Sequence, residues 1–129
     1  MAGARLLAFN PTTGEFTEFI QNTLQDFYDH LGCDCFDIAY RKVGKEGRCF
    51  DIFVDDIGLF REHPIVSAID SDYQPALVGN LIFANHDMEG NTTSLSDEEI
   101  KYIKDCVTSV TDPENGKYWY AIMPVDYPR

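Results

Sequence analysis

The clearest pattern of apolar and polar positions lies in the second half of the chain. Residues 77–85 form an apolar run bounded by polar residues, which is too short for a typical helix and suits a buried strand. After a polar turn, Ser96 stands three residues before Glu99, which is the spacing of a capping box at the start of a helix. Apolar residues then recur at helical spacing up to Val110. The pattern predicts a strand over 77–85 and a helix over 97–109.

The beginning of the chain predicts a hairpin followed by a short helix. Residues 5–9 and 15–20 flank the turn-forming sequence Asn-Pro-Thr-Thr-Gly, so they are expected to pair as antiparallel strands. A helix is expected after them, capped at its start by Asn22 or Thr23. Gly32 is expected to end this helix, because glycine readily adopts the left-handed backbone that closes a last turn.

Residues 36–43 and 48–54 are expected to form a second hairpin. Residues 45–47 suit a three-residue loop with glycine in the left-handed position. This loop places Tyr40 opposite Ile52, and it puts the apolar side chains of both strands on one face of the hairpin.

The remaining segments complete the expected fold. Residues 58–73 are expected to hold a short helix or an irregular loop, and residues 117–123 predict a final strand in which alternation separates Trp119 from its two tyrosine neighbours. The order of elements is strands, helix, strands, helix and strand. It predicts an α+β fold in a single domain of residues 1–129, with a largely antiparallel or mixed sheet and two helices packed on one face.

Composition adds a strong acidic bias to this picture. The chain of 129 residues carries 22 Asp and Glu against 10 Lys and Arg, which gives a net charge of −12. Phosphates would be repelled at long range, so the charge argues against direct binding to nucleic acid or to an anionic membrane. It is compatible with plain solubility, a cationic ligand or metal, or a basic protein partner. No membrane-spanning segment or signal peptide is recognised, so a cytoplasmic location is expected.

The acidic residues gather mainly on the predicted helix 97–109, on the turn before it, and on the segment 55–72. Negative charge at a helix start is favoured by the helix dipole, which explains the three acidic residues 97–99 locally but leaves the total unexplained. The candidate partner-binding surface consists of Asp87, Glu89, Asp97, Glu98, Glu99, Asp105, Asp55, Asp56, Glu62, Asp70 and Asp72.

Basic residues are concentrated at one place. Arg41, Lys42, Lys45 and Arg48 are four of the ten basic residues and lie around the tip of the second hairpin. They form a candidate anion-binding finger. A solvated basic hairpin tip that discourages edge-to-edge aggregation is the alternative interpretation.

The cysteines and histidines do not predict a metal site. Cys33 and Cys35 have one residue between them and no second pair follows, so the four cysteines are expected to be thiols rather than zinc ligands or disulfides. The H…HD…D order of metal-dependent phosphohydrolases is copied by His63, His86-Asp87 and then Asp105 or Asp112. However, His86 and Asp87 follow a strand and open a turn, which is the wrong context for such a site.

Known catalytic and cofactor motifs are also missing from the sequence. The aspartate pairs within 55–72 lack the alternating donors and closing glutamate of an EF-hand loop. The sequence shows no phosphate-binding loop, dinucleotide-binding glycines, nucleophile elbow or zinc-protease helix motif. No cofactor and no catalytic residue is therefore predicted, and a non-enzymatic role is expected.

Several short motifs carry a family resemblance. They are Val78-Gly79-Asn80, the turn from Asp87 to Gly90, Ser94-Leu95-Ser96-Asp97-Glu98-Glu99-Ile100, Asp55-Asp56-Ile57-Gly58-Leu59-Phe60, Pro64-Ile65 and Ala68-Ile69. With these motifs the chain resembles DUF3846, a domain-of-unknown-function family of accessory genes in phages and conjugative elements of Gram-positive bacteria. The resemblance covers roughly the whole chain and implies that genetic setting, but it implies no activity.

Charge and resemblance together lead to one main hypothesis. The protein is expected to be a small acidic interaction protein of a phage or mobile element that binds and modulates a basic host protein. In its sharpest form it is a counter-defence inhibitor whose carboxylates mimic nucleic acid and occupy the phosphate-binding groove of a nuclease.

Two other function classes stay open at this point. The first is a small-ligand module for a nucleotide signal, which would bind through the basic tip between Arg41 and Arg48. The second is a metal-dependent hydrolase that uses His63, His86 and Asp87.

Overall fold

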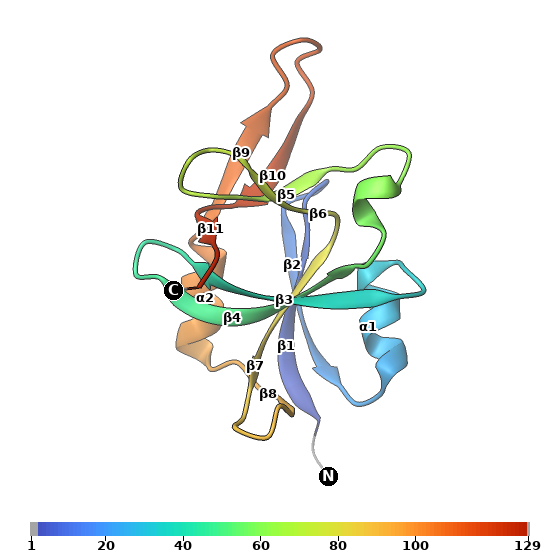
Figure 1. Cartoon of the computed structure of the whole chain (residues 1–129), viewed down its shortest axis with the longest axis vertical. Helices are drawn as coiled ribbons and strands as arrows, with labels where there is room; N and C mark the ends of the chain where they lie inside the picture. Colours follow the sequence, from blue (N-terminus) through green and yellow to red (C-terminus); the bar gives the residue numbers. More distant parts are fainter. Residues whose placement is uncertain (1–2, 129) are drawn as a thin grey trace.

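The computed structural model describes residues 3–128 and shows strands as the dominant element (Figure 1). The strands and helices follow in the order β1 (Ala4–Asn10), β2 (Glu15–Gln21), α1 (Leu24–Leu31), β3 (Phe36–Val43), β4 (Arg48–Asp55), the 3₁₀ turn η1 (Gly58–Phe60), β5 (Val66–Ile69), β6 (Pro75–Val78), β7 (Leu81–His86), β8 (Thr92–Thr93), α2 (Asp97–Lys104), β9 (Val107–Thr111), β10 (Tyr118–Ile122) and β11 (Val125–Asp126).

These strands form two sheets. The larger sheet has seven strands in the order β11-β3-β4-β7-β1-β2, with β8 paired to β7 off that path. The smaller sheet has the order β6-β5-β10-β9, and its β5–β10 pair is parallel while its other pairs are antiparallel. The fold is therefore α+β with mainly antiparallel strands and two α-helices, as the sequence predicts.

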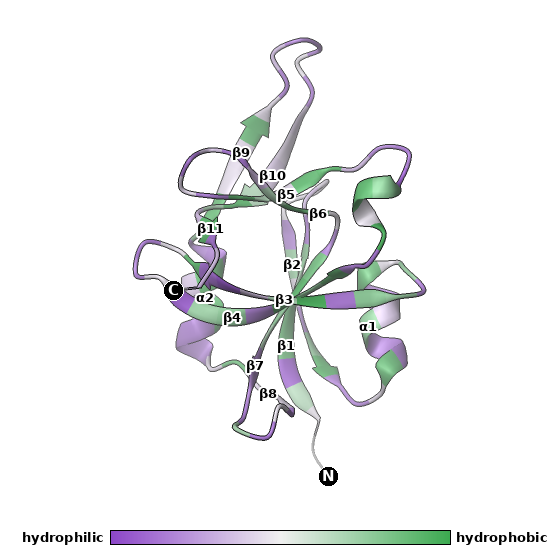
Figure 2. Cartoon of the chain, viewed as in Figure 1, coloured by the Kyte–Doolittle hydropathy of each residue, from purple (hydrophilic) through white to green (hydrophobic). Residues whose placement is uncertain are grey.

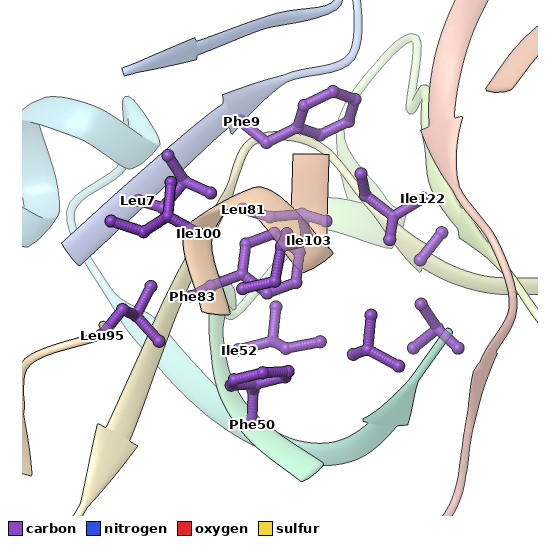
Figure 3. Close-up of a cluster of buried hydrophobic side chains, with 13 residues drawn as sticks. Leu7, Phe9, Phe50, Ile52, Leu81, Phe83, Leu95, Ile100, Ile103 and Ile122 are labelled. Atoms are coloured by element: carbon purple, nitrogen blue, oxygen red, sulfur yellow. The ribbon is translucent and has the colours of Figure 1, made fainter. Parts of the chain in front are cut away.

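The main core lies between the larger sheet, α2 and the smaller sheet (Figure 3). Leu7 on β1 packs in one cluster with Ile100 and Ile103 of α2 and with Ile122 of β10. Thus α2 and the smaller sheet cover the same face of the larger sheet. The burial of these aliphatic side chains is the main favourable term in their association.

A second core covers the opposite face. Leu6 and Ala8 of β1 pack there with Phe27 and Leu31 of α1. The Phe27 ring stacks on the ring of Phe53 with a centroid separation of 4.2 Å. The helix α1 therefore covers this smaller cluster.

The expected packing of both helices on one face is wrong. Residues 6–9 of β1 and 81–84 of β7 are all buried, so both faces of these central strands are covered. Such continuous apolar runs are typical of strands buried on both sides, whereas a half-solvated strand would alternate. Figure 2 shows the polar segments mainly at the loops and outer surfaces.

The predicted register of the β3–β4 hairpin is also wrong by one residue. Tyr40 lies opposite Asp51, and Val43 lies opposite Arg48. The loop has four residues, 44–47, because Val43 pairs with Arg48, and within it the Gly47 N–H donates to the Gly44 carbonyl at 3.1 Å. The shift places the Val43 side chain in the main core. It leaves Tyr40 on the opposite face of the sheet, which α1 partly covers.

The predicted strand over 77–85 is broken in the middle. Residues up to Val78 belong to β6 in the smaller sheet, and residues from Leu81 belong to β7 in the larger one. Gly79 makes the corner with a φ of 78°, and its N–H donates to the Ile65 carbonyl at 2.8 Å. A glycine at this corner lets the chain change sheets without backbone strain.

The predicted helix over 97–109 is shorter than expected. It ends at Lys104, and residues 107–111 form the edge strand β9 beside β10. The β-branched residues of this run fit a strand better than a helix, and pairing with β10 decides between the two states.

The other expected elements are confirmed. They are the β1–β2 hairpin, the helix between Thr23 and Gly32, the capping box at Ser96 and the aromatic strand β10. Trp119 faces inward enough for its indole N–H to donate to the Val66 carbonyl at 2.8 Å, while Tyr118 is exposed. Within residues 3–128, no helix is long and apolar enough to cross a membrane.

The hairpin loop provides a test of this fold. Gly44 has a φ of 78°, and a Cβ added there would overlap the hydroxyl of Tyr102. Gly79 has the same φ but open space around it. We expect Gly79→Ala to lower the free energy of unfolding by about 1–2 kcal/mol through backbone strain alone. Gly44→Ala should cost clearly more, and equal losses in urea unfolding would contradict the packing of Tyr102 on the loop.

Candidate functional site

A groove with an apolar lining lies between the two sheets. A pocket of about 260 Å³ is formed where the start of β3 and the end of β4 face β6. Val54 and Leu77 supply part of its apolar lining, and both are only partly buried against the main core. Asp37, Asp55 and Asp56 line the same pocket. The groove therefore combines apolar surface with three carboxylates.

The turn η1 places apolar side chains beside this groove. Leu59 and Phe60 line the pocket and are 73% and 87% exposed. The turn is fixed by Asp55, which accepts hydrogen bonds from the Ile57 N–H at 3.1 Å and from Arg61 Nε at 2.8 Å. Figure 2 shows this turn as hydrophobic although it lies outside the core. Neighbouring exposed apolar side chains with a polar rim are typical of interaction sites.

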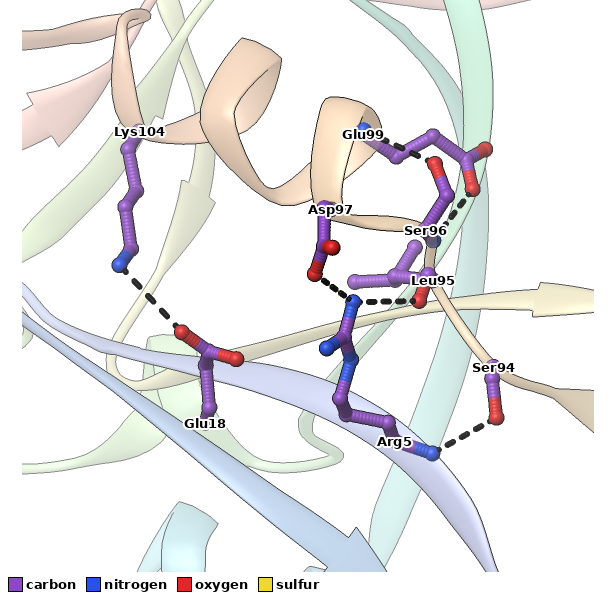
Figure 4. Close-up of polar contacts among 8 residues, drawn as sticks. All are labelled: Arg5, Glu18, Ser94, Leu95, Ser96, Asp97, Glu99 and Lys104. Carbon is purple, nitrogen blue, oxygen red and sulfur yellow. Dashed lines mark hydrogen bonds and ion pairs between the residues drawn. The ribbon is translucent and has the colours of Figure 1, made fainter.

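Three of the predicted acidic residues on or next to α2 pair with cations of the same chain, and Figure 4 shows the pair of Asp97 with Arg5. Asp97 binds Arg5 at 2.6 Å, Glu98 binds Arg48 at 3.1 Å, and Asp105 binds Lys101 at 3.1 Å. Exposed pairs of this kind contribute about 0–1 kcal/mol each, so a partner with stronger basic groups would compete for these carboxylates.

Glu99 has a structural role at the start of α2. Its carboxylate accepts from the Ser96 N–H at 2.8 Å and from the Asn85 amide at 3.0 Å. Burial alone would raise the pKa of Glu99, but the hydrogen bonds from Ser96 and Asn85 outweigh it and hold the pKa below the ordinary value. Glu99 is thus committed to the helix cap (Figure 4).

Two other predicted acidic residues organise turns. Asp87 accepts from the N–H groups of Glu89 and Asn91, each at 2.9 Å, and the Asn91 bond is the main cause that lowers the pKa of Asp87. Asp70 accepts in the same way from the N–H groups of Asp72 and Gln74 at 2.9 and 2.8 Å. Such turns give both aspartates a local reason to be present.

The eleven predicted acidic residues do not form one continuous surface. One group lies on α2 and the β7–β8 turn, which Figure 1 shows at the lower left. The β5–β6 turn, with Asp70 and Asp72, lies in the upper part of that view. Asp55 and Asp56 line the groove, and Glu62 follows them with a carboxylate 3.9 Å from the His63 ring.

The predicted basic finger is also divided by its contacts. The Arg41 guanidinium lies over the Tyr127 ring at 4.1 Å, and that of Arg48 lies 5.0 Å from the Tyr102 ring and pairs with Glu98. Lys45 is exposed in the loop, and Lys42 is half-buried on the other face of β3. The two arginines are therefore held by separate aromatic partners.

The four cysteines are present as separate thiols. Burial raises the pKa of Cys33 and of Cys106, which keeps both protonated and poorly reactive. Among residues 3–128, no three His, Cys, Asp or Glu side chains are placed together so that they could hold a metal ion.

One polar cluster was missed by the sequence reasoning. The buried Asp51 carboxylate lies 2.9 Å from Nδ1 of His86, and the Tyr40 ring lies 5.4 Å from the His86 ring. The register of β3, β4 and β7 creates this cluster, so a correct pairing of Tyr40 with Asp51 is the signal that would have found it.

The comparison with known proteins gives a family. The profile of the family described as Domain of unknown function (DUF3846) matches residues 4–108. This chain belongs to the DUF3846 family. No curated protein and no solved structure matches the chain.

The DUF3846 match covers β1 to α2 and ends within β9. It therefore includes the pocket residues between Asp37 and Val78 and the Asp51–His86 pair, whereas β10 and β11 lie outside it. Two motifs that carry the resemblance acquire structural roles: Gly79 forms the corner between the sheets, and residues 55–60 form the groove wall around η1.

The helix cap gives a pH-dependent prediction. Since the pKa of Glu99 is lowered on folding, its contribution to stability is present above the unfolded value of about 4.5 and is lost as the pH falls through the lower folded value. Glu99→Gln keeps a side chain that can cap but removes this titration. We expect the mutant to lose less stability than the wild type between neutral and acidic pH.

Urea unfolding of both proteins across this pH range measures the difference. Ser96→Ala, which removes the hydroxyl that accepts from the Glu99 N–H at 3.1 Å, should lower stability by about 1 kcal/mol at neutral pH. Parallel pH profiles for the wild type and Glu99→Gln would contradict the assigned role of the carboxylate.

Proposed function

We propose that this DUF3846 protein is a small acidic interaction protein of a phage or mobile element, which binds and modulates a basic host protein in the bacterial cytoplasm. The net charge of −12 supports a basic partner, because opposite charge accelerates encounter and repels acidic competitors. The proposed role is binding rather than catalysis.

The observation that carries this proposal is the groove beside η1. Leu59 and Phe60 present apolar area to solvent, and Asp37 and Asp56 stand at the same surface with their side chains exposed. Protein interfaces commonly combine a desolvated apolar centre with a polar rim. A basic partner would bury the two apolar side chains and place its cations against the carboxylates.

A counter-defence inhibitor is the specific form of this proposal. A nuclease groove that binds a phosphate track attracts any ordered series of carboxylates, and the release of its counterions makes such binding sensitive to salt. Asp56, Glu62, Asp72 and Glu89 are exposed and lie at the outer turns, so they are accessible to such a groove.

The test is affinity capture of the tagged protein from a bacterial host lysate, with washes of rising salt and identification by mass spectrometry. We expect a stoichiometric basic, nucleic-acid-binding partner that is released at high salt. Phe60→Ser should reduce its recovery about tenfold or more, because a central apolar anchor is lost. Since Phe60 is 87% exposed, this substitution should leave stability almost unchanged.

Met88→Ser is the matched control, because Met88 is fully exposed on the remote β7–β8 turn. Its recovery of the partner should equal that of the wild type. A partner that stays bound at high salt would contradict nucleic-acid mimicry but would still support the interaction role. Absence of any stoichiometric partner would contradict the proposed function itself.

A further inference from the structure

The outer edge of β3 is open along part of its length. On that side β11 pairs with Lys42 and Val43, and within residues 3–128 no strand continues the pairing toward Phe36. An open strand edge carries N–H and C=O groups that are ready to pair with another extended segment. The open part of this edge runs from Phe36 to Arg41.

The direction of the backbone groups on this edge follows from β11. The Gly44 N–H donates to the Pro124 carbonyl at 2.9 Å, so even-numbered residues of β3 direct their backbone groups toward the β11 side. Ile38 and Tyr40 therefore face the open side. The Ile38 N–H is covered only by the Asp37 carboxylate at 2.8 Å, and the Tyr40 carbonyl only by the Arg41 guanidinium at 3.0 Å. Both covers are side chains that an incoming strand could displace.

The groove runs along this same edge. The larger pocket includes Asp37, and a smaller pocket of about 90 Å³ includes Arg41. Both pockets share Pro75 and Ala76 of β6 as their opposite wall. A strand added to β3 would thus continue the line of β11 and direct every second side chain into the groove.

The carboxylates of the groove indicate which kind of segment can bind there. Asp37, Asp55 and Asp56 line the groove's larger pocket together with the apolar Leu77 and Phe60. A second copy of the chain would bring the same carboxylates toward each other, because each copy carries a net charge of −12. A segment that alternates basic and apolar side chains would match both the carboxylates and the apolar lining.

We propose that the open edge of β3 binds an extended segment of the partner by strand addition, with apolar side chains in the groove and basic side chains at Asp37 and Asp56. This inference rests on the proposed function and names the kind of partner segment that the site accepts. Main-chain hydrogen bonds supply affinity in this mode of recognition, and the pockets for alternate side chains supply specificity.

The experiment uses the full chain and a panel of labelled synthetic peptides, read by fluorescence anisotropy. Each peptide is long enough to span the open edge and alternates lysine or arginine with valine, isoleucine or phenylalanine. We expect at least one to bind, and to bind about tenfold or more weakly when the amides on one edge are N-methylated. Methylation removes the backbone donors without changing the side chains or the protein.

Two protein variants test the site itself. Ile38→Pro removes the outward N–H at an edge position, where proline is tolerated in sheets, and should weaken binding at least several-fold. The double variant Asp37→Asn with Asp56→Asn should weaken binding about tenfold or more. The matched control is Glu15→Gln with Glu114→Gln, which changes the net charge equally on exposed residues outside the groove. Thermal unfolding of each variant confirms that the fold is intact.

The proposal is overturned if no peptide in the panel binds, if N-methylation has no effect, or if the control pair weakens binding as much as the groove pair. A concentration-dependent dimer that Ile38→Pro dissolves would also overturn it, since a second copy would then be the occupant. If the lysate partner is still captured by the Ile38→Pro variant, the proposed function stands and strand addition alone fails.

Discussion

The structure depends on the burial of both faces of its central strands. Residues 6–9 of β1 and 81–84 of β7 have apolar side chains on both faces of the sheet, so other elements must shield each face of the larger sheet from solvent. The helix α1 covers one face, and the other is shared by α2 and the smaller sheet. This requirement explains why a chain of this size folds its last third back over its first.

The candidate site is a consequence of how the second sheet is attached. The chain leaves the larger sheet after β4, makes η1, builds β5 and β6, and returns through the corner at Gly79. This excursion brings β6 close to the edge where β3 begins, but no ladder joins β6 to β3 among the described residues. The gap between the two edges is the groove, and η1 forms the wall at its end.

Many of the acidic side chains have contacts within the protein itself. Asp55, Asp70, Asp87 and Glu99 accept backbone or side-chain hydrogen bonds that fix turns or a helix start. Asp97, Glu98 and Asp105 bind the chain's own cations. The carboxylates at the groove are therefore distinguished by their apolar surroundings rather than by their number, which is why the groove, and not the sum of charge, carries the proposal.

The sequence predicts local structure well where one signal decides it. The capping residues at Ser96 and Glu99 and the glycine at position 32 mark helix ends through hydrogen bonds and backbone freedom that are local. Val107 and Val110 continue the helical spacing by coincidence, and only the pairing of β9 with β10 shows that they belong to a strand.

The other features could not be predicted from the sequence because they depend on pairing between distant residues. Glycines at positions 44 and 47 fit a loop of three or four residues, and the core position of Val43 selects the longer one. The Asp51–His86 pair joins residues that are 35 positions apart, and the groove combines segments from both sheets. Neither could be located without the register that tertiary packing sets.

The central claim is that the partner binds at the groove between β3 and β6. Hydrogen–deuterium exchange of the protein, alone and in complex with the captured partner, tests it most directly. The account predicts slower exchange at residues 36–41 and 57–60, with the β7–β8 turn unchanged. Protection confined to α2 and the β7–β8 turn, with free exchange along the β3 edge, would contradict it.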